Sequence, residues 1–256
     1  MLRVLVVRKY DDFSRILSEA GFSIVNCPTV KTVALENTSD FDEQTAPLES
    51  YDGVFLTSVT AAEIFRRKLR EIKHGFGGKV YVLGKRSFDL LKHESLDLFF
   101  DETANTASEM FEKIAPEALE SKRFLFVRGE KSLRVVPGFL KTRATLDEAI
   151  VYKTERVAVG IDKINELREE LGGEIACACF FSPSAAESFI EQFGAAFLHQ
   201  TIIATIGKTT AEFIQRCNLT VDYVARRATA EDFAVELIEY LKTVSPGKYA
   251  RDTKRR

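Results

Sequence analysis

The chain has 256 residues, of which 45% are hydrophobic and 29% are charged, and its formal net charge is −2 at pH 7. This composition is ordinary for a soluble globular protein, and the near-neutral charge argues against general nucleic-acid binding. No apolar run approaches the ~18 residues of a membrane span, and the chain begins with a strand rather than a signal-peptide pattern. We therefore expect a cytoplasmic protein that does not enter a membrane.

Strands and helices are predicted to alternate from the N-terminus onward. The first half has predicted strands at residues 2–7, 22–27, 52–57, 79–83, 96–100 and 123–127, and predicted helices at about 11–20, after Thr60, and at 87–93, 106–119 and 133–142. Pro137 is expected to kink the last of these helices or to shift its start. The alternation predicts parallel sheets that are flanked by helices.

Three segments are harder to place in this alternation. The polar run 36–50, which contains Pro47, is predicted to be a loop. The runs 29–35 and 153–159 have the pattern of extended chain, and the two could pair with each other. Beyond them we expect an amphipathic helix at 162–171 and a flexible basic tail at 244–256.

Short blocks of sequence recur at a separation of about 120 residues, which is far longer than the period of a solenoid. The matching pairs are 4–8 with 124–128, 54–63 with 179–187, 79–85 with 201–208, and 106–109 with 229–232. The chain is therefore predicted to contain two copies of one α/β domain.

Hydroxyl residues stand where the repeated strands lead into helices. Thr60 with Glu63, and Ser184 with Glu187, have the spacing of a capping box. Because hydroxyls and free N–H groups would gather at the carboxyl edge of each sheet, a ligand with several carboxylates would suit these edges. Plain helix capping explains the same residues, so the pattern alone leaves both interpretations open.

Cysteines, nucleotide motifs and metal spacings give no sign of a cofactor. None of the four cysteines forms a C-x-x-C pair, and Cys177 and Cys179 are predicted to be buried free thiols on one strand face. No P-loop and no G-x-G-x-x-G occurs. We therefore expect neither a metal nor a cofactor.

Taken together, the motifs resemble those of the uroporphyrinogen-III synthase family over residues 2 to about 242. The resemblance is carried by Val7 with Arg8, Pro28, residues 55–58 (Phe-Leu-Thr-Ser), Leu83 with Gly84, residues 127–129 (Val-Arg-Gly) with Arg134, Val151 with Tyr152, residues 180–184 (Phe-Phe-Ser-Pro-Ser) and residues 206–210 (Ile-Gly-Lys-Thr-Thr). Val59 departs from the proline that many members have there, and Ser87 from their threonine.

The resemblance implies a fold of two flavodoxin-like domains joined by a two-stranded linker, with the active site in the cleft between them. The first domain would be discontinuous and would comprise residues 1–34 and 160–243. The second would comprise 36–152, and the linker would consist of 29–35 and 153–159.

The resemblance also implies a reaction, the cyclisation of hydroxymethylbilane to uroporphyrinogen III with inversion of ring D and loss of water. The protein would be a cyclising hydro-lyase of heme and other tetrapyrrole biosynthesis, and its substrate could be handed over by hydroxymethylbilane synthase. We expect a monomer. The alternative is a non-catalytic two-domain module that binds a tetrapyrrole or another anion.

Site residues follow from the same resemblance. Tyr152 matches a proposed proton donor of the family and Thr210 a threonine of the cleft, so both are assigned to catalysis. The residues assigned to substrate binding are Arg8, Thr57, Ser58, Ser87, Arg128, Ser182, Ser184, Lys208 and Thr209. From the sequence alone, a packed tyrosine at a domain edge is the favoured interpretation of Tyr152, and Arg8 and Arg128 could form surface salt bridges.

Overall fold

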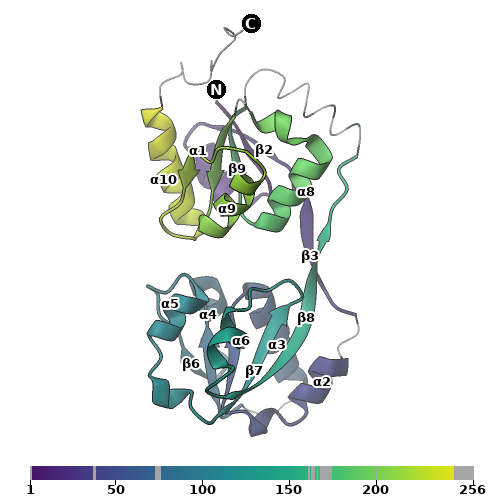
Figure 1. Cartoon of the computed structure of the whole chain (residues 1–256), viewed down its shortest axis with the longest axis vertical. Helices are drawn as coiled ribbons and strands as arrows, with labels where there is room; N and C mark the ends of the chain where they lie inside the picture. The colour runs from purple at the N-terminus through teal and green to yellow at the C-terminus, as the bar shows by residue number, and fades with distance from the viewer. Residues whose placement is uncertain are drawn as a thin grey trace, which may run out of the picture. The chain divides into compact units, whose positions relative to one another are not determined.

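The structure is a computed structural model that describes residues 2–36, 39–72, 76–160, 162, 165, 167, 175–199 and 201–244. The chain forms two compact units (Figure 1). Unit 1 consists of Met1–Lys31 and Arg156–Arg256, and unit 2 of Thr32–Glu155. Most of the predicted helix at 162–171 and the tail beyond Val244 lie outside the described residues.

Each unit contains a parallel sheet with helices along it. The elements of unit 1 are β1 (Arg3–Val6), α1 (Asp12–Glu19), β2 (Ser23–Asn26), β9 (Ile175–Phe180), α8 (Pro183–Phe193), β10 (Ile202–Thr205), α9 (Lys208–Arg216), β11 (Tyr223–Val224) and α10 (Ala230–Thr243). Those of unit 2 are α2 (Ser39–Thr45), β4 (Gly53–Leu56), α3 (Val59–Ile72), β5 (Lys79–Val82), α4 (Lys85–Leu91), β6 (Asp97–Phe99), α5 (Ala107–Glu112), β7 (Arg123–Gly129) and α6 (Val135–Leu140). Two strands cross between the units, β3 (Val30–Ala34) and β8 (Thr145–Arg156).

The two sheets have the same strand order. Sheet 1 runs β11-β10-β9-β1-β2, and sheet 2 runs β6-β5-β4-β7-β8 with β3 added beside β8. The repeated blocks put β1, β9 and β10 in correspondence with β7, β4 and β5, and these strands occupy equivalent places in the two sheets. The predicted fold class, with two parallel-sheet α/β domains that arose by duplication, is confirmed.

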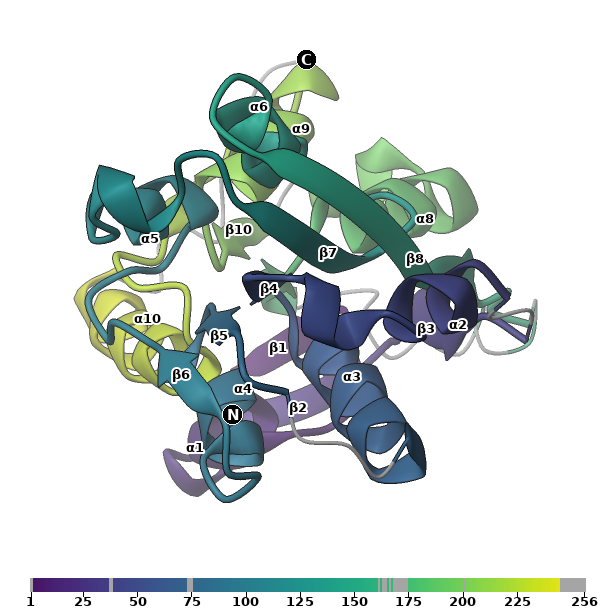
Figure 2. The same ribbon diagram turned by 90° about the horizontal axis from the view of Figure 1, so that it is seen from below.

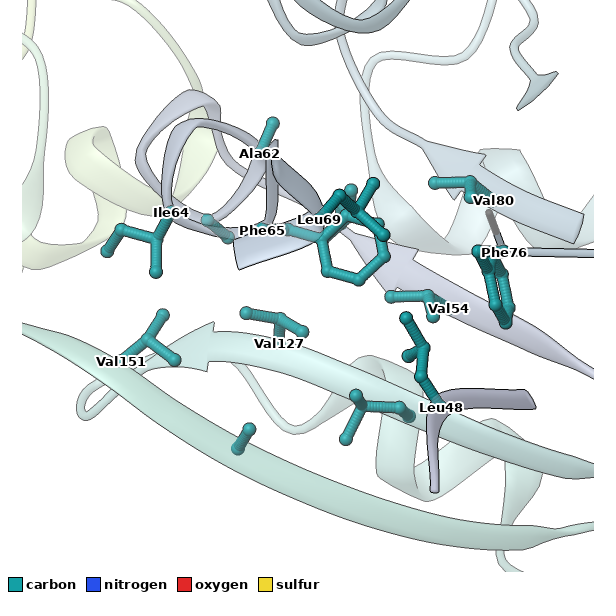
Figure 3. Packing of buried hydrophobic residues seen from close by; sticks show 14 of the residues in the cluster. Leu48, Val54, Ala62, Ile64, Phe65, Leu69, Phe76, Val80, Val127 and Val151 are labelled. Carbon is teal, nitrogen blue, oxygen red and sulfur yellow. The ribbon is translucent and has the colours of Figure 1, made fainter. Parts of the chain in front are cut away.

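The core of unit 2 lies on both faces of its sheet, because alternate residues of a strand point in opposite directions. Val54 and Leu56 of β4 pack on the face covered by α3, which Figure 3 shows from close by. Phe55 between them packs on the opposite face, with residues of α5 and α6. Figure 2 accordingly shows α3 and α6 on opposite sides of β7 and β8.

Unit 1 has the same three layers. Cys177 and Cys179 point to the face covered by α1 and α10, and their Sγ atoms lie 3.8 Å apart. Both are fully buried and neither is in a disulfide. Burial, followed by the contact with Cys177, raises the pKa of the Cys179 thiol. The prediction of buried free thiols is confirmed.

The capping boxes predicted at Thr60 and Ser184 are wrong, and both helices begin two residues earlier than these caps imply. Ser58 Oγ accepts from the Ala61 N–H, and Ser182 Oγ accepts from the Ala185 N–H, each over 3.2 Å. Ser182 has extended backbone, as an N-cap residue does. The same two-residue displacement occurs in both copies, so the correspondence between the two repeated blocks is kept.

Other boundaries also differ from the prediction. Of the predicted loop at 36–50, the described residues 39–50 form α2 and a short 3-10 helix at Leu48–Ser50, and Phe41 and Leu48 are buried. The helix predicted at 87–93 begins at Lys85, directly after Gly84. Pro137 lies in the first turn of α6, where its missing N–H costs no hydrogen bond.

At the amino edge of sheet 2, Tyr51, Asp147 and Arg123 form a hydrogen-bonded cluster. The Tyr51 hydroxyl donates to Asp147 Oδ2 over 2.9 Å, and Arg123 Nη2 donates to the same oxygen over 2.7 Å. Burial, followed by the hydrogen bond to Asp147, raises the pKa of Tyr51 to about 12. Since this pKa is above the ordinary value near 10, the neutral tyrosine contributes stability that is complete below pH ~10 and lost as the pH rises toward 12.

We therefore expect the stability difference between the wild type and Tyr51→Phe to shrink above pH ~10. Urea unfolding of both proteins across this range measures the difference. A difference that stays constant to pH ~12 would show that the hydrogen bond to Asp147 does not hold the phenol in its neutral form.

Candidate active site

The carboxyl edge of each parallel sheet is the expected place for a site, because open α/β sheets bind ligands there, at the point where the strand order reverses. The order reverses between β1 and β9 in unit 1, and between β7 and β4 in unit 2. The predicted site residues form one group in each unit. Unit 2 carries Thr57, Ser58, Ser87, Arg128 and Tyr152, and unit 1 carries Arg8, Ser182, Ser184, Lys208, Thr209 and Thr210.

Tyr152 and Ser58 are in direct contact in unit 2. The Tyr152 hydroxyl donates a hydrogen bond to Ser58 Oγ over 3.0 Å. Tyr152 comes from β8 and Ser58 from the link between β4 and α3, so residues 94 positions apart meet at the edge of one sheet. The ring of Tyr152 is half-buried and packs against the core that α3 covers. Tyr152 is thus a packed tyrosine whose hydroxyl is nevertheless held in a defined direction.

Gly129, the last residue of the Val-Arg-Gly motif, lies directly against the ring of Tyr152. It is the last residue of β7 and lies opposite Tyr152 in the sheet register. A Cβ atom at Gly129 would lie 2.4 Å from Cε2 and 2.5 Å from Cζ of Tyr152. A larger side chain at Gly129 would therefore require the ring of Tyr152 to move, because the ring lies directly on the backbone of β7.

Arg128 is held by its neighbours in unit 2. Its Nε donates to Glu148 Oε2 over 2.6 Å, and its Nη1 donates to the carbonyls of Gly129 and Glu130. Arg134 binds the same carboxylate with two hydrogen bonds of 2.7 and 2.9 Å. Burial alone would raise the pKa of Glu148, but the hydrogen bonds from Arg134 and Arg128 outweigh it and lower that pKa. Arg128 therefore forms a salt bridge, as one of the two interpretations of the sequence predicted, and its partner Glu148 was not predicted.

The remaining candidates of unit 2 differ in exposure. Thr57 is half-buried at the end of β4. Ser87 lies in α4 and is only 1% exposed, and its Oγ has no hydrogen-bond partner among the described residues. The structure thus places Ser87 near the carboxyl edge but inside the protein rather than on its surface.

In unit 1, Ser182 and Ser184 are brought together at the start of α8, with their Oγ atoms 3.2 Å apart. Arg8 follows β1, pairs with Asp11 over 2.9 Å, and lies over the ring of Phe181 at 4.4 Å from its centroid. The ends of β1 and β9 thus carry a cation and two hydroxyls, at the point where the strand order reverses.

Three further candidates stand in the first turn of α9, which follows β10. The N-cap residue of the helix is Gly207, which has no side chain to accept a hydrogen bond. Lys208 and Thr209 are exposed, whereas Thr210 is 4% exposed and packs into the unit. The first-turn N–H groups of α9 are therefore not used by a side-chain cap at Gly207.

Among the described residues, no cluster of three or more His, Cys, Asp or Glu side chains has a geometry suited to a metal ion. Within the same residues, every helix is too short or too polar to cross a membrane.

These observations define a duplicated α/β protein of the flavodoxin-like type, with hydroxyls and cations at the carboxyl edges of both sheets. The sequence model of the family described as "Uroporphyrinogen-III synthase HemD" matches residues 11–234. The chain belongs to the uroporphyrinogen-III synthase family, and the resemblance inferred from the motifs is confirmed.

Individual relatives agree with this assignment. The chain is 30% identical over 260 residues to a uroporphyrinogen-III synthase of Chlorobaculum parvum, covering 94% of this chain and all of the relative. The crystal structure of uroporphyrinogen-III synthetase from Helicobacter pylori has a TM-score of 0.66 at 19% identity, over 94% of this chain and all of that one. A mutant synthase from Thermus thermophilus has a TM-score of 0.63 at 15% identity, over 95% of this chain and all of that one. The two structures support the fold.

Proposed function

We propose that this chain catalyses the reaction of its family, the closure of hydroxymethylbilane to uroporphyrinogen III with inversion of ring D and release of water. The observation that carries the proposal is the pair of Tyr152 and Ser58 at the reversal point of sheet 2. This pair places an oriented proton donor at a sheet edge whose other groups favour anions.

The reaction makes three demands on the protein. It must hold a flexible substrate with its ends together. Because the entropy is then lost on binding and not in the transition state, such positioning lowers the activation free energy by up to ~7–11 kcal/mol in favourable cases. It must protonate the departing hydroxyl, so that water leaves rather than hydroxide. It must then stabilise the resulting azafulvene cation and keep bulk water away until the ring closes.

Tyr152 is assigned the second of these tasks. The Tyr152 O–H first turns from Ser58 Oγ to the leaving hydroxyl. When the phenol then gives up its proton, the C–O bond of the substrate breaks and water departs. A negative charge is left on Tyr152 Oη and a positive charge on the azafulvene. The proton that the substrate loses when the ring closes restores the phenol, so the enzyme ends the cycle unchanged.

The other candidates are assigned to the carboxylates of the substrate. Ser182, Ser184, Thr209 and Lys208 offer hydroxyls, a cation and helix N-terminal N–H groups, and all of these groups favour anions. Thr57, Ser87 and Arg8 keep the binding role that the family resemblance implies. Arg128 is assigned instead to holding the segment after β7, because Glu148 and two backbone carbonyls already accept its hydrogen bonds. Thr210 is proposed to act in catalysis from the first turn of α9.

The finer points of organisation are part of the same proposal. They comprise a discontinuous first domain at 1–34 and 160–243, a second domain at 36–152, a two-stranded linker at 29–35 and 153–159, a monomeric state, a cytoplasmic location, and delivery of the substrate by hydroxymethylbilane synthase. The two strands that cross between the units support the linker.

A coupled assay tests the proposed function. Hydroxymethylbilane is generated in situ, and the uroporphyrinogen isomers are separated after oxidation. We expect the type III isomer to dominate in the presence of the wild type. If a folded wild-type protein yields only type I, the product of unassisted closure, the chain is not a synthase, and the non-catalytic binding module becomes the better interpretation.

A further inference from the structure

We infer that Ser58 is a positioning residue of Tyr152 rather than a ligand of substrate carboxylates, and that it couples the phenol to the N-terminus of α3. This inference rests on the proposed function, and it changes the role that the family resemblance implied for Ser58. It starts from the two hydrogen bonds that Ser58 Oγ accepts.

The Oγ of Ser58 has no acceptor capacity left. A serine hydroxyl carries two lone pairs and one hydrogen. The Ala61 N–H donates to Oγ over 3.2 Å, and the Tyr152 hydroxyl donates over 3.0 Å. Only the hydroxyl hydrogen of Ser58 remains to form a further bond, and an ionised Tyr152 Oη is the acceptor that already lies within reach, at 3.0 Å. The backbone contact with Ala61 fixes the oxygen, while the hydrogen can turn.

Turning this hydrogen gives Ser58 a task in the reaction. When Tyr152 gives up its proton, its Oη changes from donor to acceptor, and the Ser58 hydroxyl can then donate to it. Hydrogen bonds to a charged oxygen are shorter and about twice as strong as neutral ones. Ser58 is itself fixed to the first turn of α3, a helix of 14 residues whose N-terminus carries partial positive charge. The charge that develops on Tyr152 is thereby stabilised by the helix, with Ser58 as the link.

The other copy of the domain supports a role tied to Tyr152. Ser182 makes the same cap in unit 1, where its Oγ accepts from the Ala185 N–H over 3.2 Å. Its second hydroxyl contact is Ser184, not a tyrosine. Capping is thus common to both copies, whereas the contact with a tyrosine occurs in unit 2. The serine of unit 2 therefore combines the shared cap with a partner that can ionise.

A double-mutant cycle separates this role from substrate binding. We expect Tyr152→Phe to lower kcat by about 10²-fold, at the low end for a general acid because phenol is a weak acid. We expect Ser58→Ala to lower kcat by about tenfold with KM unchanged, because the lost interaction forms only in the transition state. In the Tyr152→Phe background, Ser58→Ala should change kcat by less than about twofold, since the group it serves is gone.

Three further variants distinguish this role from a loss of folding. Ser58→Gly removes the hydroxyl but keeps a residue that is tolerated at a helix N-cap, and it should lower kcat as Ser58→Ala does. Ser58→Thr restores a hydroxyl and should recover most of the lost rate. Thr106→Ala removes a cap of α5 in the same unit that does not involve Tyr152, and it should lower the melting temperature about as much as Ser58→Ala with kcat unchanged.

The outcomes are distinct. If Ser58→Ala raises KM, or if its effect multiplies fully with that of Tyr152→Phe, Ser58 acts on the substrate and the inference is wrong. A wild type that yields only the type I isomer would instead remove the proposed function itself, whatever the cycle shows.

Discussion

Replacing Gly129 by alanine is expected to lower kcat by about 10²-fold, as misplacements of about 1 Å in a reacting group do. The new Cβ would lie 2.4 Å from the Tyr152 ring and 2.9 Å from its hydroxyl oxygen, and no real contact is that short. Gly129 and Tyr152 are paired in adjacent strands, so neither backbone can move away easily. The ring must tilt, and its hydroxyl then leaves Ser58. Crowding of this kind also lowers the free energy of unfolding by about 1–3 kcal/mol.

A second glycine of unit 2 gives the matched control. Gly138 lies in α6, and a Cβ atom there would have no neighbour within 4 Å. Gly138→Ala is therefore expected to leave kcat unchanged and to stabilise the protein by about 0.5–1 kcal/mol, because alanine favours a helix over glycine. Activity and urea unfolding of both variants provide the measurement. A Gly129→Ala protein with wild-type kcat would show that the position of the Tyr152 ring does not limit the reaction.

The strands and their order could be predicted from the sequence because local signals and the repeat agree. Apolar runs such as 124–127 are long enough to show a buried strand, and their recurrence after about 120 residues shows that there are two domains. The helix starts were placed wrongly because Thr60 with Glu63 and Ser184 with Glu187 satisfy a local rule that competes with an earlier hydroxyl. Only the backbone path out of each strand decides between them.

The site was predictable in its residue types but not in its contacts. Ser58 and Tyr152 were both singled out, yet nothing in the sequence indicates that they touch across 94 positions. The contact between Gly129 and the Tyr152 ring could not be predicted either, because a glycine after a strand more often marks a turn than a contact with an aromatic ring. Glu148 was missed because it lies in a run with mixed polarity. Its importance comes from two arginines that the fold places beside it.

The two arginines on Glu148 are expected to differ sharply when each is replaced by methionine. Arg128 has a side chain that is 11% exposed, and it also bonds the carbonyls of Gly129 and Glu130, whereas the Arg134 side chain is 63% exposed. Arg128→Met leaves a part-buried carboxylate and two carbonyls without this donor, so we expect a loss of about 2–3 kcal/mol in unfolding free energy. Arg134→Met removes a largely exposed pair and should cost less than about 1 kcal/mol.

The pH dependence of this difference has a definite sign. A carboxyl whose pKa is lowered in the folded protein contributes stability that is present above its unfolded pKa and lost as the pH falls. The pKa of Glu148 is lowered, so the gap between the wild type and Arg128→Met should narrow below pH ~4.3. Unit 1 offers a comparison, because the position that corresponds to Glu148 on β2 is Asn26, whose side chain donates to the Arg8 carbonyl. We therefore expect the Glu148–Arg128 pair of unit 2 to contribute stability that is lost in acid, and Asn26 of unit 1 to make no such contribution.

The same variant decides between two roles of Arg128. If the guanidinium mainly holds the segment after β7, Arg128→Met lowers stability and, by loosening Gly129 under the Tyr152 ring, lowers kcat more than it raises KM. If the guanidinium mainly binds a substrate carboxylate, stability is kept and KM rises. Urea unfolding and steady-state kinetics on the same preparations distinguish the two. Because Glu148 already occupies Arg128 in the structure, we expect the first result.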